Sequence, residues 1–257
     1  MSRTPRLTAA GATDVGRVRE QNEDCYALHP ELGLAVLADG MGGHQAGEVA
    51  ATLATDTIVQ RLAHRERGLR PAPTRGRRAR AKTPPQLMAE ALAAANTAVY
   101  RAAQARPEYR GMGATVVVAV LAGTRLYFAH AGDSRLYRLR DGALEQLTQD
   151  HSLVQDLVTR GLFTPEEARH SPAKNVVTRA LGVDAVLEPE LGSTAVAKGD
   201  VYLLCSDGLT DVVSDPEIAG ILADAADPRT AVQRLVERAN ALGGPDNISV
   251  VVLRLDP

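Results

Sequence analysis

Residues 34–47 read LAVLADGMGGHQAG, an apolar run that ends in an aspartate and then in glycines. One Asp-Gly pair after a buried strand is weak evidence of function, since both residues commonly end strands in turns. Three other segments share this character, and they are RLYFAHAGD (125–133), VYLLCSDG (201–208) and GGPDNISVVVLRL (243–255). Four acidic residues therefore lie at the mouths of predicted strands: Asp39, Asp133, Asp207 and Asp246. Their repetition points to a shared role.

Hydrophobic periodicity predicts the elements around these segments. Helical spacing of apolar residues predicts helices over 45–63 and 85–104, with two more starting near Asp215 and Pro228. Residues 6–39 read as strand, loop and strand, and further strands are expected at 113–121, 124–132, 134–140, 143–148, 187–194, 200–205 and 246–255. The Asp141-Gly142 pair predicts a hairpin turn. Because strands and helices come in blocks, the order favours an α+β layered sandwich over a doubly wound parallel sheet.

Composition limits the class of protein. With 257 residues and 45% hydrophobic content, the chain is expected to form a single domain over 1–257. Its 29 basic and 31 acidic residues give no signal for nucleic acid or an anionic membrane. Two cysteines without metal spacing predict free thiols, and the absence of a signal core or of an apolar run of about 20 residues predicts a cytoplasmic protein without a membrane span. A monomer is the plain expectation.

Two segments differ from the rest. Residues 65–85 carry prolines, glycines and like charges, which predict a mobile basic insert, with docking of an acidic partner as the minority interpretation. Since eight basic residues and one acidic residue lie between Arg65 and Lys82, the remainder of the chain is acidic, which suits a cation site. Residues 150–182 hold short helical pieces and few large apolar residues, and predict a flap over a surface.

Clustered carboxylates without histidine or cysteine ligands are typical of sites for Mg²⁺, Mn²⁺ or Ca²⁺ rather than Zn²⁺. Two such ions about 4 Å apart can share a carboxylate, activate a water and hold a phosphoryl group. Glycine beside an aspartate lets a backbone carbonyl approach as a further ligand. Spacing alone does not establish that the four aspartates converge.

Seven ordered motifs give the chain a resemblance that spans nearly its whole length. They are RVREQNED (17–24), VLADGMGGH (36–44), GMGATVVVAVL (111–121), FAHAGDSRLYRLRDG (128–142), LTQDHS (147–152), LLCSDGLTD (203–211) and GGPDNISVVV (243–252). In this order they resemble the type 2C metal-dependent (PPM) serine/threonine protein phosphatases, in particular the bacterial branch that opposes Hanks-type kinases. The resemblance implies a four-layer α-β-β-α sandwich with two central, mainly antiparallel sheets.

The resemblance also implies a metal centre with two Mn²⁺ or Mg²⁺ ions and a weaker site for a third. By this resemblance, Asp39 would bridge the two ions and Gly40 would add its backbone carbonyl. Asp207 and Asp246 would complete the ligands of the first ion. Asp133, together with Asp207, would hold the third and weaker ion.

It further implies the roles of the RVREQNED motif. Glu23 and Asp24 would act mostly through waters on the metals, and Arg19 would grip the substrate phosphate as a fork. With Asp39 and Asp207, Arg19 makes up the predicted catalytic set. The implied reaction is hydrolysis of phosphoserine or phosphothreonine in proteins by metal-activated water, with a Ser/Thr kinase and its targets as partners.

Several residues depart from this family pattern or suggest other chemistry. Met41 occupies a position where some family members have a histidine proposed as general acid, and His44 nearby is more plausible as a structural residue. His151 and Ser152 could be read with an aspartate as a hydrolase triad, but the chain has no G-x-S-x-G motif and no P-loop. Cys205 is predicted to be a buried strand residue rather than a nucleophile.

The sequence is compatible with two alternative functions. A pseudophosphatase would keep the fold as a regulatory binding module, and it predicts lost ligand positions, whereas all of those matched here are filled. A phosphatase of a small phosphorylated metabolite, or of a sigma-factor-type phosphorylated regulator, would keep the metal centre and change the substrate.

Overall fold

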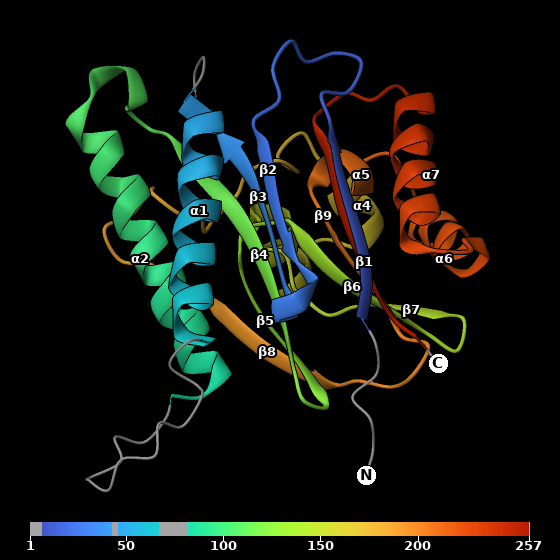
Figure 1. Cartoon of the computed structure of the whole chain (residues 1–257). Helices are drawn as coiled ribbons and strands as arrows, with labels where there is room; N and C mark the ends of the chain where they lie inside the picture. The colour runs from blue at the N-terminus through green and yellow to red at the C-terminus, as the bar shows by residue number, and fades with distance from the viewer. Residues whose placement is uncertain (1–6, 43–45, 67–81, 257) are drawn as a thin grey trace, which may run out of the picture.

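The computed structural model describes residues 7–42, 46–66 and 82–256, with the side chains of 64–66 excepted. Two five-stranded sheets stack face to face, and helices cover both outer faces (Figure 1). The predicted four-layer α-β-β-α sandwich is confirmed. No helix among the described residues has the length and apolar character needed to cross a membrane.

Every neighbouring pair of strands in both sheets is antiparallel. The first sheet has the order β2 (Asp24–His29), β3 (Leu34–Met41), β4 (Gly113–Ala122), β5 (Arg125–Ala131) and β8 (Glu190–Ala195). The second has the order β1 (Leu7–Asp14), β10 (Ile248–Leu255), β9 (Val201–Cys205), β6 (Arg135–Arg140) and β7 (Ala143–Gln146). The predicted turn joins β6 and β7, with φ of 50° at Asp141 and 78° at Gly142.

The helices fall into three groups. Helices α1 (Ala46–Glu66) and α2 (Pro84–Ala105) cover the first sheet, while α6 (Asp215–Asp224) and α7 (Pro228–Ala241) pack on the second, next to the short α5 (Asp207–Thr210). The predicted flap carries α3 (Leu153–Thr159) and α4 (Pro165–Arg169). Two 3₁₀ turns, Pro30–Leu32 and Pro107–Tyr109, complete the described elements.

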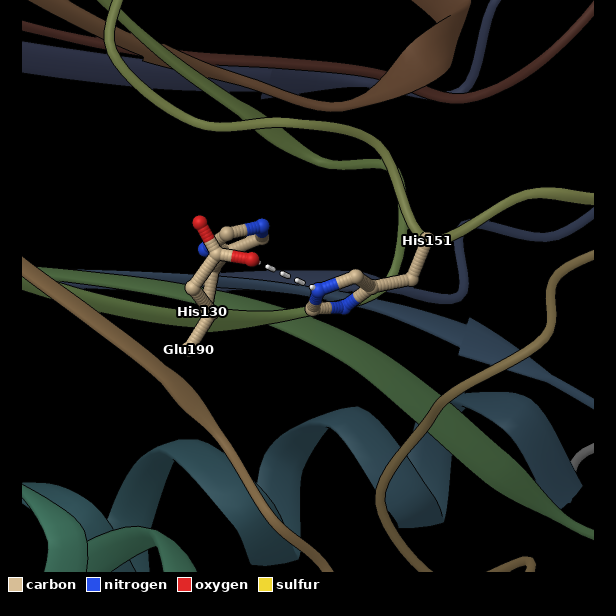
Figure 2. A group of neighbouring side chains, drawn as sticks. All are labelled: His130, His151 and Glu190. Carbon is tan, nitrogen blue, oxygen red and sulfur yellow. Dashed lines mark hydrogen bonds and ion pairs between the residues drawn. The ribbon is translucent and has the colours of Figure 1, made fainter. Parts of the chain in front are cut away.

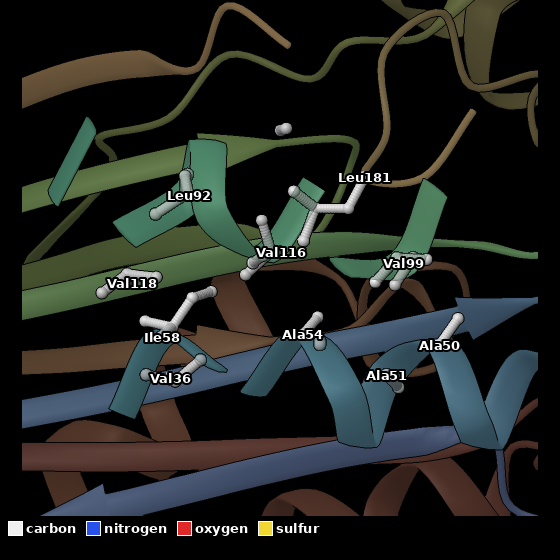
Figure 3. Packing of buried hydrophobic residues seen from close by; sticks show 14 of the residues in the cluster. Val36, Ala50, Ala51, Ala54, Ile58, Leu92, Val99, Val116, Val118 and Leu181 are labelled. Atoms are coloured by element: carbon white, nitrogen blue, oxygen red, sulfur yellow. The ribbon is translucent and has the colours of Figure 1, made fainter. Parts of the chain in front are cut away.

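Alternation along the strands builds three hydrophobic layers. In β3, Val36 faces α1 and α2, while Leu37 faces the other sheet. In β9, Leu203 likewise faces the outer helices and Leu204 the space between the sheets. The small side chains of α1, among them Ala50 and Ala54, let that helix lie close to the first sheet (Figure 3). Both faces of each sheet are therefore packed, and the ends of the strands can position reactive groups.

Some expected boundaries were wrong. Residues 6–39 contain three strands rather than two, since β2 is an edge strand whose side chains are mostly half-buried and leave a weak apolar pattern. The four-residue α5 is too short to produce a periodic signal. Residues 65–66 close α1 and 84–85 open α2, where Thr83 and Gln86 form a capping box. The rest of the basic insert, over 67–81, and His44 lie outside the described residues.

Candidate metal centre

The antiparallel order of the strands brings the predicted acidic residues to one end of the sandwich, where several strands begin or finish. This end is called the acidic edge below. Asp39, near the end of β3, pairs in register with Asp24 at the start of β2. Asp133 follows the end of β5, which lies at that same edge because β4 runs back between β3 and β5. In the second sheet, the end of β9 meets the start of β10, so Asp207 and Asp246 lie at the matching edge.

The carboxyl groups at this edge interact strongly through space. Withdrawal from water and the charges of Asp24 and Asp207, followed by those of Asp133 and Asp246, raise the pKa of Asp39 well above its usual range. The same combination of burial and neighbouring carboxylates raises the pKa of Asp207. Carboxyl groups in such surroundings are ionised at neutral pH only where positive charge compensates them. The structure thus brings these acids to the same end of the sandwich, where their charges interact, but among the described residues no three of their oxygens lie within 4.8 Å of one another.

Two carboxylate oxygens at this edge are buried without a hydrogen-bond partner in the described structure, namely Oε1 of Glu23 and Oδ1 of Asp24. Burial raises the pKa of Asp24 to about 6, against hydrogen bonding to Ser249 and Ser206. An unpaired buried acceptor costs about 1–3 kcal/mol, and more when it is charged. Because hard divalent cations bind carboxylate oxygens, these residues fit Mn²⁺ or Mg²⁺.

Arg19 contributes positive charge beside the acids. Its Nη2 donates to Oδ2 of Asp246 over 2.8 Å, and its side chain is 51% exposed. Burial alone would lower the pKa of Arg19, but the charges of Asp246, Glu23 and Asp207 outweigh it and raise the pKa. This half-exposed guanidinium therefore remains charged and close to the acids.

Sequence reasoning missed two residues that hold the acids in place. Asn247 accepts a hydrogen bond from the backbone N–H of Glu23 over 2.8 Å and donates to the carbonyls of Val15 and Gln21 over 3.0 and 2.9 Å. Ser206 Oγ donates to Oδ2 of Asp24 over 2.9 Å. The only available signal was their position next to Asp246 and Asp207.

Glycines beside the aspartates permit very close backbone packing. A Cβ on Gly40 would lie 2.1 Å from the carbonyl oxygen of Gly47. A Cβ on Gly208 would lie 2.0 Å from the carbonyl oxygen of Asn247. These contacts exclude any side chain, so both glycines are required by geometry rather than by turn conformation alone.

A second group of potential ligands lies apart from the carboxylates. Within the described chain, one set of three His, Cys, Asp or Glu side chains brings ligand atoms within 4.8 Å of one another, and it is His130, His151 and Glu190. The two imidazoles are stacked, with centroids 4.5 Å apart and planes 9° from parallel (Figure 2). Nitrogen lone pairs lie in the ring planes, so stacked rings cannot both direct them at one ion. Nη1 of Arg179 also lies 3.1 Å from Nε2 of His151. The group is therefore better described as a hydrogen-bonded strut.

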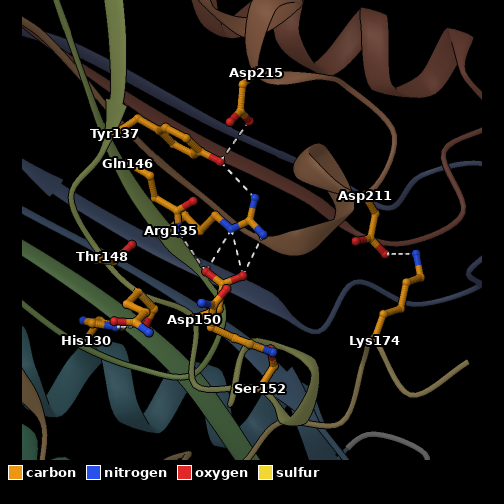
Figure 4. Close-up of polar contacts among 12 residues, drawn as sticks. His130, Arg135, Tyr137, Gln146, Thr148, Asp150, Ser152, Lys174, Asp211 and Asp215 are labelled. Atoms are coloured by element: carbon orange, nitrogen blue, oxygen red, sulfur yellow. Dashed lines mark hydrogen bonds and ion pairs between the residues drawn. The ribbon is translucent and has the colours of Figure 1, made fainter. Parts of the chain in front are cut away.

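A group of hydrogen bonds centred on Arg135 lies beside Asp133. Arg135 donates three hydrogen bonds of 2.6–3.0 Å to the carboxylate of Asp150, and a fourth, of 2.9 Å, to the hydroxyl of Tyr137 (Figure 4). Burial and the charge of Asp150 raise the pKa of Asp133 to about 6. A cavity of about 690 Å³ opens here, lined by Asp133, Asp207 and residues of the flap.

The alternative nucleophiles fail on geometry. Ser152 Oγ accepts the backbone N–H of Gln155 as the cap of α3, and Nδ1 of His151 accepts the N–H of Gly132, so neither is arranged for a triad. Cys205 is fully buried, which raises the pKa of its thiol to about 12. Both cysteines are free thiols, as predicted.

The sequence and the fold are similar to those of known protein phosphatases. A family model described as protein phosphatase 2C matches residues 17–243. The serine/threonine protein phosphatase PstP of Mycobacterium tuberculosis is 42% identical over 249 residues, which are 96% of this chain and 44% of PstP. The serine/threonine phosphatase stp of Listeria monocytogenes is 34% identical over 247 residues, 95% of this chain and 94% of stp. The solved catalytic domain of PstP in complex with two manganese ions has a TM-score of 0.83 at 39% identity, covering 98% of this chain and 99% of that one.

Proposed function

The chain belongs to the protein phosphatase 2C family, and from this membership we propose that it hydrolyses phosphoserine and phosphothreonine in proteins with the help of Mn²⁺ or Mg²⁺. The observation that carries the proposal is the gathering of Asp24, Asp39, Asp133, Asp207 and Asp246 at one edge of the sandwich. The chain spans less than half of its mycobacterial relative, so the activity and substrates of the whole protein belong to the proposal.

Residues of both sheets would hold the ions. Asp39 and the carbonyl of Gly40 come from the first sheet, and Asp207 and Asp246 from the second, while Asp133 would serve a third ion. Glu23 and Asp24 would act through water. When bound, such ions lower the pKa of water and offset the charge of a phosphoryl group.

The remaining groups bind and orient the substrate. Arg19 would grip the phosphate with the donors that its single hydrogen bond to Asp246 leaves available. Water would add to phosphorus and release one proton to solvent as the ester P–O bond breaks, and the serine or threonine oxygen would leave. Met41 has no proton to give, so this oxygen takes its proton from water.

The two alternatives receive less support. The pseudophosphatase predicted missing ligand positions, and every carboxylate position matched to the family is filled and lies at the common edge. The curated relatives are described as protein phosphatases, which favours phosphoproteins over small metabolites. We further infer a single catalytic domain, a monomer, a cytoplasmic location and a Ser/Thr kinase whose targets it dephosphorylates.

The direct test measures phosphate release from a phosphothreonine peptide and from a phosphorylated sugar, each with Mn²⁺, Mg²⁺ or EDTA. We expect metal-dependent release that favours the peptide. Preference for the sugar would move the function to metabolite hydrolysis. No release from folded protein with any metal would support the pseudophosphatase.

Replacing Arg19 with alanine is expected to raise KM for the peptide about 10- to 100-fold, since charge-assisted hydrogen bonds to phosphate are lost. Arg19→Lys keeps the positive charge but not the forked donor geometry, so its KM should lie between those of Arg19→Ala and the wild type. Steady-state kinetics at saturating Mn²⁺ measure this. An unchanged KM in Arg19→Ala would remove Arg19 from phosphate binding.

Stabilisation by metal should depend on pH. The pKa values of Asp24 and Asp133 are about 6 in the folded protein, above the value near 4 of an unfolded chain. The folded state therefore binds more protons, and its stability in EDTA falls as pH rises from about 4 to about 6. Cations bind the ionised carboxylates and offset this loss. Melting curves should show a larger gain from Mn²⁺ at about pH 7.5 than at about pH 5, and equal gains would contradict the assignment.

A further inference from the structure

The strut formed by His130, His151 and Glu190 lies between two functional segments that the sequence separates. One is the Asp133 loop, residues 132–134, which follows β5. The other is the flap, residues 150–182. His151 opens the flap, yet it stacks on His130 of β5 (Figure 2). The strut thus joins the flap to the strand that delivers Asp133.

The side chain of His151 makes an oriented hydrogen bond to the Asp133 loop. Its Nδ1 accepts the backbone N–H of Gly132 over 3.2 Å, which requires Nδ1 to be without a proton. The proton is then on Nε2, which donates to Oε2 of Glu190 over 3.3 Å. With the proton on Nε2, Nη1 of Arg179 lies 3.1 Å from that nitrogen as a second donor, so it makes no hydrogen bond there.

The backbone of His151 links the same two segments. Its N–H donates to the carbonyl of Gly132 over 3.0 Å, so Gly132 is bound at both its N–H and its carbonyl. The carbonyl of His151 accepts the N–H of Thr178 over 2.8 Å. Ser152 and Val177 then form an antiparallel bridge, which closes the base of the flap.

The other side of the Asp133 loop is fixed by steric contact. Gly132 has φ of +113°, and a Cβ there would lie 2.4 Å from Cβ of Thr115 in β4. Ser134 and Thr115 share a hydrogen bond of 2.7 Å between their hydroxyls. Asp133 lies between these residues and is 9% exposed. Besides β4, the loop is thus held by the two hydrogen bonds between Gly132 and His151.

We propose that His151 is a positioning residue that couples the flap to the Asp133 loop, and so sets the affinity for the ion that Asp133 and Asp207 hold. The inference rests on the proposed function, since it takes Asp133 to be a metal ligand. It adds a route by which the conformation of the flap would change metal affinity without any flap side chain binding the ion.

Variants at His151 and at Glu190 distinguish this role from a general contribution to packing. In His151→Asn the amide oxygen lies near the position of Nδ1 and can accept the N–H of Gly132. In His151→Gln the amide lies near the position of Nε2 and leaves that N–H without an acceptor. Glu190→Ala removes the partner of Nε2 and keeps the bond to Gly132, and Glu190 is exposed, so the fold tolerates the change.

Calorimetric titration with Mn²⁺ and hydrogen exchange of the flap provide the readouts, both without substrate. We expect His151→Gln and His151→Ala to weaken the weakest Mn²⁺ site about tenfold, with tighter sites unchanged, and to speed exchange of flap amides by a similar factor. His151→Asn and Glu190→Ala should match the wild type in Mn²⁺ affinity.

Three results would overturn the proposal. If folded His151→Gln binds Mn²⁺ as tightly as the wild type, the flap and the Asp133 loop are not coupled through His151. If His151→Asn and His151→Gln lose the same Mn²⁺ affinity, the effect comes from packing of the imidazole ring. Weakening in Glu190→Ala equal to that in His151→Gln would assign it to the ion pair. If His151→Ala does not fold, the Asn and Gln pair carries the comparison. A wild type that binds Mn²⁺ but releases no phosphate would refute only the proposed function.

Discussion

Replacing Asp39 with asparagine is expected to lower kcat by about a thousandfold or more while raising the stability of the protein in EDTA. The loss follows from removing a carboxylate that both ions would share. The gain follows because burial and the neighbouring carboxylates raise the pKa of Asp39, so its ionised form costs folding free energy at neutral pH. Asp207→Asn should behave alike, since its pKa is raised for the same reasons. Phosphopeptide kinetics and melting curves measure the two effects.

Asp200→Asn is the matched control for this pair of effects. Asp200 immediately precedes β9 and Asp207 follows it, so the two lie at opposite ends of one strand. Asp200 accepts hydrogen bonds of 2.7 Å from both Nε and Nη2 of Arg140. Burial would raise the pKa of Asp200, but these bonds outweigh it and lower the pKa. Its replacement should therefore destabilise the fold and leave kcat near wild type. Near wild-type activity in Asp39→Asn would show the metal assignment to be wrong.

Replacing Gly208 with alanine is expected to lower kcat about a hundredfold and to reduce the melting temperature by several degrees. The new Cβ would lie 2.0 Å from the carbonyl oxygen of Asn247, a backbone atom that cannot move without its neighbours. Since Gly208 follows Asp207 and Asn247 follows Asp246, the shift would separate two predicted ligands of one ion. Mn²⁺ titration of the variant should show weaker binding.

Gly220→Ala controls for the loss of a glycine. Gly220 lies inside α6, and a Cβ there has no neighbour within 4 Å. In a helix interior alanine is more stable than glycine by about 1 kcal/mol, so this variant should be more stable than the wild type and fully active. Unchanged activity and stability in Gly208→Ala would contradict the close packing of the β9 and β10 ends.

Local patterns in the sequence were sufficient for much of the fold. The apolar stripes of α1 and α2, the Asp141-Gly142 turn and the runs of β4 and β9 are each encoded by neighbouring residues, and periodicity predicts such elements well. The edge strand β2 and the short α5 were missed because half-buried or four-residue elements leave weak patterns. The order of the motifs also indicates the family without any knowledge of tertiary contacts.

The sequence by itself determined that acidic residues stand at strand mouths beside glycines, and which family's chemistry they match. Only the tertiary structure decided which of them meet. Ser206 reaches Asp24 across 182 positions, and Arg19 reaches Asp246 across 227. The bond from Gly132 to His151 likewise depends on the packing of a flap against a strand. Such contacts follow from the register of strands and the stacking of sheets, which bring distant residues together through long-range packing that no local spacing encodes.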